Sequence, residues 1–300
     1  MDRLHELEVF VAAAETGSLA KAAARMRLSP PAATRAIAAL EDRLGVPVFT
    51  RTTRSLTITE AGQRLFGHAQ RILADFEAAQ REAVGENATP AGHLTVTTSV
   101  TFGRSILAPL ACEFLAAFPR VTASVLLLDR VTNLVEEGID LAVRIGQLPD
   151  SSLIARRVGD VRRILVASPD YLERQGTPAA PDDLKRHVVI AFTGLMPNRE
   201  WRHLQEGRMT SLALSPRFEV NDALAAIDAA VAGHGLTIAL SYMVDDLIRE
   251  GALVRVLEHS APPQPVHLVY PQSRLVAPKI RAFVDFAAPK LEAALRPHSD

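Results

Sequence analysis

The segment from Ser29 to Leu44 constrains the fold of this chain more than any other. Ser29 can cap a helix, and Pro30 lies in the first helical turn, where its missing N–H removes no hydrogen bond. Apolar residues then recur at helical spacing at Ala33, Ile37, Leu40 and Leu44. This stripe predicts an amphipathic helix whose inner face packs against other helices.

Two shorter helices are expected before it. Apolar residues at helical spacing begin at Leu4, and Gly17 ends that pattern. Ser18 is well placed to cap a second helix, which is rich in alanine and has a small inner face. A turn at Arg27 and Leu28 leads into the third helix, so this part of the chain predicts three helices packed together.

The outer face of the third helix carries small residues, one hydroxyl and one guanidinium. At about 100° per residue, the side chains that point away from the core are Pro31, Arg35, Ala38 and Asp42, with Thr34 at the flank. Small side chains allow a helix to approach the major groove closely, and arginine binds guanine edges or phosphates. We therefore expect a DNA-binding helix; the alternative is a three-helix scaffold with a solvated polar face.

Two short β-prone runs follow Gly45 and flank a polar tip with Arg51 and Arg54. They predict a hairpin wing whose arginines contact phosphate or the minor groove, with two solvated arginines on a turn as the alternative. Between Gly17 and Thr57 the chain has seven basic and two acidic residues, although its overall formal net charge is −1. Basic charge concentrated in this segment would attract a polyanion.

The string LSPPAATRAIAALEDRLGVPVFTRTTRSLTITEAG resembles the DNA-binding signature of LysR-type transcriptional regulators. Helix-turn-helix, wing and closing TEAG all occur in the family's order and spacing. Together with the outer helix face, the resemblance predicts contacts with double-stranded promoter DNA by Arg27, Ser29, Pro31, Ala32, Thr34, Arg35, Ala38, Arg51 and Arg54. Where many members carry Gln-Pro-Ala-Val-Ser-Arg, this chain has Pro30 in place of the glutamine, while Thr34 keeps the hydroxyl and Arg35 the charge.

A long helix is expected after Thr59, which can act as its N-cap. Apolar residues recur in it at alternating spacings of four and three, beginning with Leu65, Ala69, Ile72 and Phe76. The pattern is that of a two-helix coiled coil, and the alternative is that the stripe packs on its own DNA-binding domain. The resemblance implies a linker helix that forms a homodimer, which presents two recognition helices to two half-sites, and by analogy a homotetramer.

From His93 onward, β-prone runs alternate with helical ones, including a helical run at 132–138, and this alternation predicts parallel βαβ units. The arrangement resembles the family's two-lobed α/β effector domain, which has the fold of type 2 periplasmic binding proteins. We therefore expect an α+β multidomain chain. Its expected parts are a winged helix-turn-helix in 1–58, a linker helix in 59–86 and an effector domain in 91–300, with lobes at about 91–161 plus 266–295 and 162–265.

Ligands of such folds bind between the lobes, at the carboxyl ends of strands and at helix N-termini, where free N–H groups favour anions. Residues at these positions are Ser99, Val100, Thr101, Phe102, Asp129, Arg144, Thr193 and Asn221. The resemblance implies effector contacts for 99–102, so we expect a cleft for a small-molecule effector, with an anion as one candidate. Alternatively, Ser99, Thr101 and Asn221 are helix caps and Arg144 belongs to a structural ion pair.

Other classes of function are disfavoured. The chain has no Gly-x-Ser-x-Gly, His-Glu-x-x-His or phosphate-loop pattern. We therefore expect that it is not an enzyme and that it has neither a cofactor nor a metal site. Its single cysteine, Cys112, excludes an internal disulfide and is expected to be buried in a helix. A transport-type binding protein would need a secretory signal, which the first residues lack. We expect a cytoplasmic protein without a membrane segment, with RNA polymerase as a further candidate partner.

Overall fold

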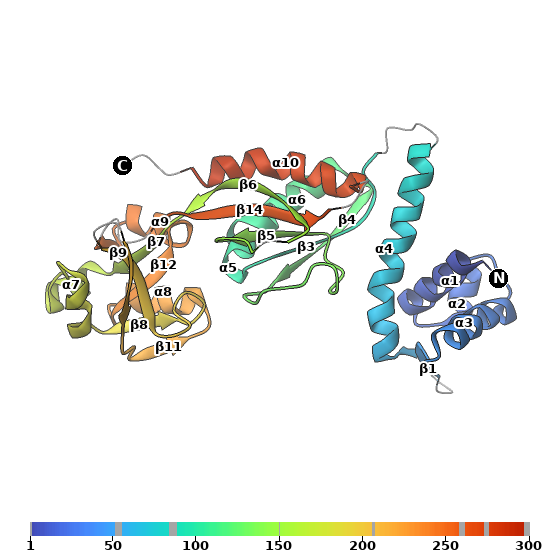
Figure 1. The fold of residues 1–300 in the computed structure, drawn as a ribbon, viewed down its shortest axis with the longest axis horizontal. Coiled ribbons are helices and arrows are strands. Elements are labelled where there is room, and N and C mark those ends of the chain that lie inside the picture. The colour runs from blue at the N-terminus through green and yellow to red at the C-terminus, as the bar shows by residue number, and fades with distance from the viewer. Residues whose placement is uncertain are drawn as a thin grey trace. The chain divides into compact units, whose positions relative to one another are not determined.

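The computed structural model describes residues 2–51, 56–83, 89–149, 151–205, 208–257, 262–272 and 276–296 (Figure 1). The chain divides into two compact units, one made largely of residues 1–92 and the other of most of the remainder. The elements of the first unit are α1 (Arg3–Thr16), α2 (Leu19–Arg25), α3 (Pro30–Leu44), β1 (Phe49–Arg51), β2 (Leu56–Ile58) and α4 (Glu60–Ala83).

The ends of these helices follow the expected local chemistry. Ser18 caps α2 and accepts a hydrogen bond from the Lys21 amide. Glycines with positive φ, Gly17 at 61° and Gly45 at 70°, follow α1 and α3, because a left-handed residue costs glycine little. Thr59 Oγ1 accepts from the Gly62 amide at 3.0 Å and so caps α4 as predicted.

The core of the first unit is drawn from all three helices, the wing and α4. The predicted inner face of α3 is confirmed at Ala33, Ile37 and Leu40, which are buried. It is wrong at Leu44, which is 43% exposed, while Ala36 is buried instead. The reason is that the helix turns about 100° per residue, so a stripe drawn at every third and fourth position drifts off the packed face by its last turn.

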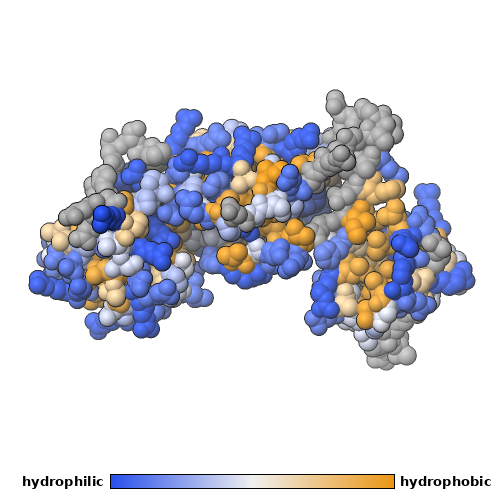
Figure 2. All heavy atoms as spheres, in the orientation of Figure 1, coloured by the Kyte–Doolittle hydropathy of each residue, from blue (hydrophilic) through white to orange (hydrophobic). Residues whose placement is uncertain are grey.

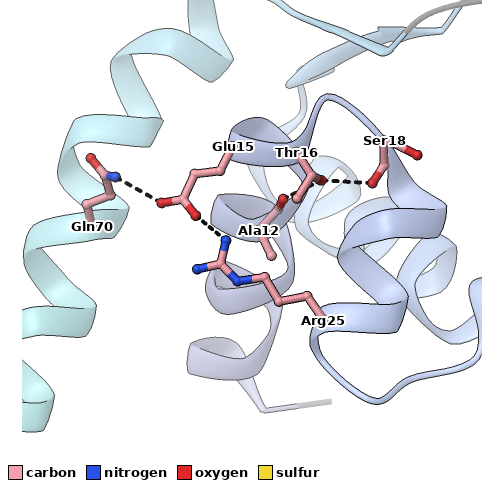
Figure 3. Close-up of polar contacts among 6 residues, drawn as sticks. All are labelled: Ala12, Glu15, Thr16, Ser18, Arg25 and Gln70. Carbon is pink, nitrogen blue, oxygen red and sulfur yellow. Dashed lines mark hydrogen bonds and ion pairs between the residues drawn. The ribbon is translucent and has the colours of Figure 1, made fainter.

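Polar contacts fix the helices to one another and to the wing. The carboxylate of Glu15 in α1 accepts hydrogen bonds from Arg25 in α2 and Gln70 in α4 (Figure 3). Glu41 in α3 accepts from the amides of Val48 and Phe49, at 2.8 and 3.2 Å, and so holds the start of the wing. These contacts give α3 a fixed position within its own unit.

The second unit contains two five-stranded sheets, each covered by helices, which we name the first and second lobes. The first lobe has the strand order β4-β3-β5-β14-β6. Its elements are β3 (Gly92–Thr98), α5 (Val100–Phe102), η1 (Gly103–Leu107), α6 (Ala108–Ala117), β4 (Val121–Leu127), β5 (Leu141–Ile145), β6 (Leu153–Val161), β14 (Gln264–Pro271) and α10 (Pro278–Ala294).

The second lobe has the strand order β11-β8-β12-β7-β13, with the separate hairpin β9-β10. Its elements are β7 (Arg163–Ala167), α7 (Pro169–Gln175), η2 (Pro181–Arg186), β8 (Val189–Phe192), β9 (Glu200–Gln205), β10 (Arg208–Ala213), β11 (Phe218–Val220), α8 (Ala223–Val231), β12 (Leu236–Leu240), α9 (Ser241–Arg249) and β13 (Val254–Val256). The crossing from β6 to β7 is a single residue, Arg162.

The expectation of parallel units is correct only in part. Strand β5 runs parallel to β3, and β8 runs parallel to both β11 and β12. However, β14 is antiparallel to β5 and β6, and β7 is antiparallel to β12. The reversed strands are the ones that connect the lobes, because a chain that crosses to the other sheet and later returns enters it from the opposite end.

Two local expectations were also wrong. Residues 132–138 form no helix, and 134–138 form turns, because Asn133 Oδ1 accepts from the Val135 and Glu136 amides and so satisfies them locally. Cys112 is exposed on α6, since the buried side of that helix is formed by Leu110, Ala111 and Phe114. The continuous helix Val100–Ala117 is apolar enough to cross a membrane by composition, but its buried side chains belong to the core of the first lobe.

Candidate functional site

The outer face of α3 is open to solvent where the sequence predicts it. Pro31, Arg35 and Ala38 are exposed, and Ala32 and Thr34 are half-buried. The hydroxyl of Thr34 donates to the Pro30 carbonyl at 3.1 Å, which satisfies a carbonyl at the start of the helix. The surface is therefore shallow and carries one projecting guanidinium, that of Arg35.

The turn before α3 and the wing beyond it border this face. Arg27 is exposed and has a left-handed backbone, with φ of 55°, as the tight turn between two helices requires. Ser29 occupies the N-cap of α3, but its side chain makes no capping hydrogen bond. The backbone of Arg51 pairs with Leu56 in the wing hairpin. Arg54, the other predicted wing contact, lies outside the described residues.

The apolar stripe of α4 has a buried part and an exposed part. Ala69 is fully buried in the core of its own domain, and Leu65 is partly buried against that core. Packing on its own domain, the alternative weighed above, therefore accounts for this half of the stripe. Ile72 and Phe76 remain 46% and 45% exposed. Figure 2 shows apolar surface over α4. Ile72 and Phe76 are the exposed large apolar side chains among the described residues of this helix.

A cavity of about 380 Å³ lies between the lobes of the second unit. Its lining includes four of the predicted residues, Ser99, Thr101, Asp129 and Arg144. The other four predicted residues do not line it. Phe102 is buried in the first-lobe core, and Val100 donates its amide to Asp129 Oδ1 at 3.0 Å. Thr193 and Asn221 follow β8 and β11, but Phe192 and Gly194 line the cavity in place of Thr193.

The junction between β3 and α5 places two buried hydroxyls at the cavity, those of Thr98 and Ser99. Thr98 Oγ1 and Ser99 Oγ are buried without a hydrogen-bond partner of good geometry among the described residues. A buried hydroxyl without a partner costs free energy, so each is a ready donor or acceptor for a bound molecule. The alternative of three helix caps is wrong: the Ser99 hydroxyl forms no capping bond, Thr101 lies within α5, and Asp222 rather than Asn221 caps α8.

Arginines contribute the positive charge of the cavity. Arg144 Nη2 donates to the Thr132 carbonyl at 2.7 Å. This partner is neutral, so the contact is not the structural ion pair that was the alternative expectation for Arg144. Arg163, at the start of β7, also lines the cavity and was not predicted. Burial lowers the pKa of Arg163, and the positive charge of Arg202 lowers it further.

Sequence reasoning missed Arg163 and Gln264 because both stand at the amino ends of strands. The rule that ligands bind at the carboxyl ends of strands holds for parallel strands. Strand β7 is antiparallel to β12, and Arg163 is in register with Leu240 at the carboxyl end of β12. Likewise β14 is antiparallel to β5, so Gln264 lies near the end of β5. Knowing which strands cross between lobes would have located both residues.

The winged helix-turn-helix and the two-lobed domain with its cavity define a DNA-binding protein of the ligand-responsive kind. Residues 4–63 match the bacterial regulatory helix-turn-helix protein model of the lysR family, and residues 87–292 match the LysR substrate binding domain. The chain therefore belongs to the LysR family of transcriptional regulators. Proteins of this family bind promoter DNA and small-molecule effectors and form oligomers, and this chain is a regulator rather than an enzyme.

Similar proteins match along the whole chain. The HTH-type transcriptional regulator CrgA of Neisseria meningitidis serogroup B is 34% identical over 288 residues, which are 95% of this chain and 96% of CrgA. The regulator PgrR of Escherichia coli K12 is 32% identical, with coverage of 95% and 96%. The solved structure of CrgA matches with a TM-score of 0.62 and 33% identity, and covers 96% of this chain and 98% of that one.

Proposed function

We propose that this regulator binds its effector in the cavity between the lobes, in contact with Ser99, Thr101, Asp129 and Arg144. The observation that carries the proposal is the buried hydroxyl of Thr98, which has no hydrogen-bond partner among the described residues, beside the buried hydroxyl of Ser99, whose near neighbour is the Tyr242 hydroxyl. A bound molecule with polar atoms would satisfy both and would touch residues of both lobes. Binding would then favour one relative placement of the lobes, and that preference alters the DNA contacts.

The effector that suits this cavity best is an anion. Arg130 and Arg144 bring positive charge from the first lobe and Arg163 from the second, and Asp129 is the carboxylate among the lining residues. The carboxylate oxygen of Asp129 already accepts the first amide of the helix, so that amide is not free for a ligand. The anion preference therefore rests on the arginines rather than on the helix N-terminus.

For DNA, the proposed contacts are made by the exposed face of α3 and by the turn and wing beside it. Arg35 would bind a guanine edge or a phosphate, while Pro31 and Ala38 permit close approach. Arg27, Ser29, Ala32, Thr34, Arg51 and Arg54 complete the proposed set. With few long polar side chains on this face, sequence preference would depend on the arginines, DNA shape and the paired half-sites.

The proposed assembly is a homodimer formed through the exposed part of the α4 stripe, and two dimers would form a homotetramer. Ile72 and Phe76 support the dimer, because exposed side chains of this size in a helical stripe are typical of coiled-coil seams. The proposed domain division remains 1–58, 59–86 and 91–300. Such a regulator would act in the cytoplasm, where it meets the chromosome, with RNA polymerase as a further partner.

The test uses the full-length protein, a fluorescent promoter fragment from upstream of its own gene, and a metabolite library screened by thermal shift. Compounds that raise the Tm of the wild-type protein are tested for a change in DNA affinity. Thr101→Val should lose the response to such a compound, because a methyl group cannot form the hydrogen bonds of the hydroxyl, and it should keep its DNA affinity, because Thr101 lies outside the DNA-binding domain. An unaltered response in this variant would remove the cavity from the proposal.

A further inference from the structure

Arg163 begins β7 directly after the crossing between the lobes. Strand β6 ends at Val161 in the first lobe, so Arg162 alone separates the two strands. The side chain of Arg162 is exposed, whereas Arg163 is half-buried and lines the cavity. Two adjacent arginines thus have opposite environments, as expected for successive residues of an extended chain.

The surroundings of Arg163 disfavour its charge. Burial and the neighbouring charge of Arg202 both lower its pKa, and no carboxylate among the described residues opposes them. Its Nε is buried without a hydrogen-bond partner in the part of the chain that the structure describes. Because a guanidinium remains charged in proteins, the cavity contains a cation that has an unused donor and an unfavourable neighbour.

The other charged groups that line the cavity are Asp129, Arg130 and Arg144, and each of them already has an interaction within the structure. Asp129 receives the Val100 amide at 3.0 Å and would repel an anion near the start of the helix. Arg144 has the Thr132 carbonyl as a partner for Nη2. An acidic group of a ligand would be stabilised most at Arg163, because it would supply the missing hydrogen-bond partner of Nε and would offset the repulsion from Arg202.

We propose that Arg163 binds an oxyanion of the effector, such as a carboxylate, sulfate or phosphate group, and thereby selects acids over their neutral analogues. The proposal deepens the proposed function and rests on it. A planar guanidinium presents parallel N–H donors that match two oxygens of such a group. Selection follows because a neutral analogue would leave the buried charge uncompensated.

The position of Arg163 also connects the anion to the crossing between the lobes. Its backbone pairs with Leu240 at the end of β12, and the Ser241 amide donates to the Arg162 carbonyl at 2.8 Å. The next residue, Tyr242, packs against Phe102 of the first lobe. An anion at Arg163 would therefore act on the strand pair that leads directly into the contact between the lobes.

The experiment measures the thermal stability of the full-length protein with inorganic sulfate as the minimal oxyanion. Sulfate is titrated at constant ionic strength against chloride, in wild-type protein and in the variants Arg163→Gln, Arg163→Lys and Arg162→Gln. Sulfate should raise the wild-type Tm, and Arg163→Gln should weaken the apparent sulfate affinity about 10- to 100-fold, the range for a charge-assisted hydrogen bond. Arg163→Lys should keep part of the effect, and Arg162→Gln, the matched control, should keep all of it.

A second arm tests small carboxylates, each paired with its neutral amide, and includes Thr101→Val. At least one acid should stabilise the wild-type protein more than its amide does, and Arg163→Gln should abolish that difference. Equal sulfate responses in wild type and Arg163→Gln would overturn the role of Arg163, as would the absence of any oxyanion response in the wild type. If neutral amides still stabilise the protein and Thr101→Val abolishes their effect, the proposed effector site in the cavity is supported and only the assignment of an anion to Arg163 fails. If no compound acts at all, both proposals fail.

Discussion

Tyr242 in α9 packs edge-to-face against Phe102 in α5, with ring centroids 5.3 Å apart and an angle of 75° between the ring planes. Tyr242 belongs to the second lobe and Phe102 to the first, so this pair is a direct contact between the lobes. Burial raises the pKa of Tyr242, and the hydroxyl of Ser99 is its near neighbour across the contact. The cavity wall and the contact between the lobes therefore share the helix that begins after Ser99.

Tyr242→Ala should destabilise the effector domain by about 2–4 kcal/mol, because it removes an aromatic side chain from the packed contact between the lobes. Tyr242→Phe keeps the ring pair and should cost less than about 1.5 kcal/mol. Trp201, the only tryptophan of the chain, is buried in the second lobe and provides a fluorescence signal for urea unfolding. Equal midpoints for Tyr242→Ala and wild type would show that the ring pair contributes nothing.

Glu6 in α1 and Arg43 near the end of α3 form an ion pair in which the carboxylate is buried and the guanidinium is partly exposed. Arg43→Ala would leave a buried carboxylate without its partly exposed partner, so we expect a loss of about 1–3 kcal/mol in the unfolding free energy of the DNA-binding domain. The matched control is Arg25→Ala, which removes the more exposed pair with Glu15 and should cost less than about 1 kcal/mol. Similar losses in both variants, measured by urea unfolding with circular dichroism, would contradict this difference.

Arg35→Ala should weaken promoter binding by about 1–3 kcal/mol if Arg35 binds a guanine edge, with relaxed sequence preference at that position. If Arg35 binds a phosphate instead, affinity should fall about equally for all sequences, and the salt slope should decrease by about 1. Fluorescence anisotropy at several salt concentrations distinguishes these results. Affinity that is unchanged at every salt concentration would remove Arg35 from the DNA contacts.

The helices and most strands could be predicted because their determinants are local. Ser18 and Thr59 act as caps at the predicted positions, and Gly17 and Gly45 end helices with left-handed backbones. Tertiary packing determines the features that the local sequence pattern does not specify. The burial of Ala36 instead of Leu44 depends on where the neighbouring helices touch α3. Strand β6 was missed because its residues 153–161 include consecutive arginines, Arg156 and Arg157, whose side chains reach solvent at a sheet edge.

Within the candidate site, the first lobe was easier to predict than the second. Ser99 and Thr101 follow a strand and precede a helix, a position that the sequence pattern reveals directly. The position of Arg163 at the cavity depends on the direction of β7, and that direction is set by the crossing of the chain between the two sheets. Thr193 and Asn221 were chosen by the same rule as Ser99, but Phe192 and Gly194 line the cavity on either side of Thr193, and Asn221 is not among its lining residues.

Phe76→Glu should shift the oligomer equilibrium toward the monomer, because it places a charge in the exposed part of the α4 stripe. Ile72→Glu should act in the same way. Gln63→Glu is the matched control, since Gln63 is exposed on the same helix and lies about half a turn away from Ile72 in projection. Analytical ultracentrifugation over a concentration series measures the change, and identical dissociation constants for Phe76→Glu and Gln63→Glu would exclude this stripe from the interface.

His187 should make the stability of the second lobe depend on pH between about 7 and 5. Burial lowers the pKa of His187, with the carboxylate of Asp183 opposing this in part, so the folded state binds fewer protons than an unfolded chain whose histidine pKa is about 6.5. Its Nδ1 lies 3.2 Å from the hydroxyl of Tyr171, which already accepts the Val188 amide and so has its proton free to donate to a neutral ring. Stability is therefore lost as the pH falls through the unfolded value.

The measurement is urea unfolding followed by Trp201 fluorescence at several pH values, with His187→Gln compared with wild type and with His234→Gln, a change at an exposed histidine. The wild-type protein and His234→Gln should lose unfolding free energy more steeply on acidification than His187→Gln, in which the amide can accept the Tyr171 hydroxyl without titrating. His267, whose pKa burial also lowers, is present in all three proteins, so its contribution cancels in the comparison. Equal slopes would show that protonation of His187 is not coupled to folding.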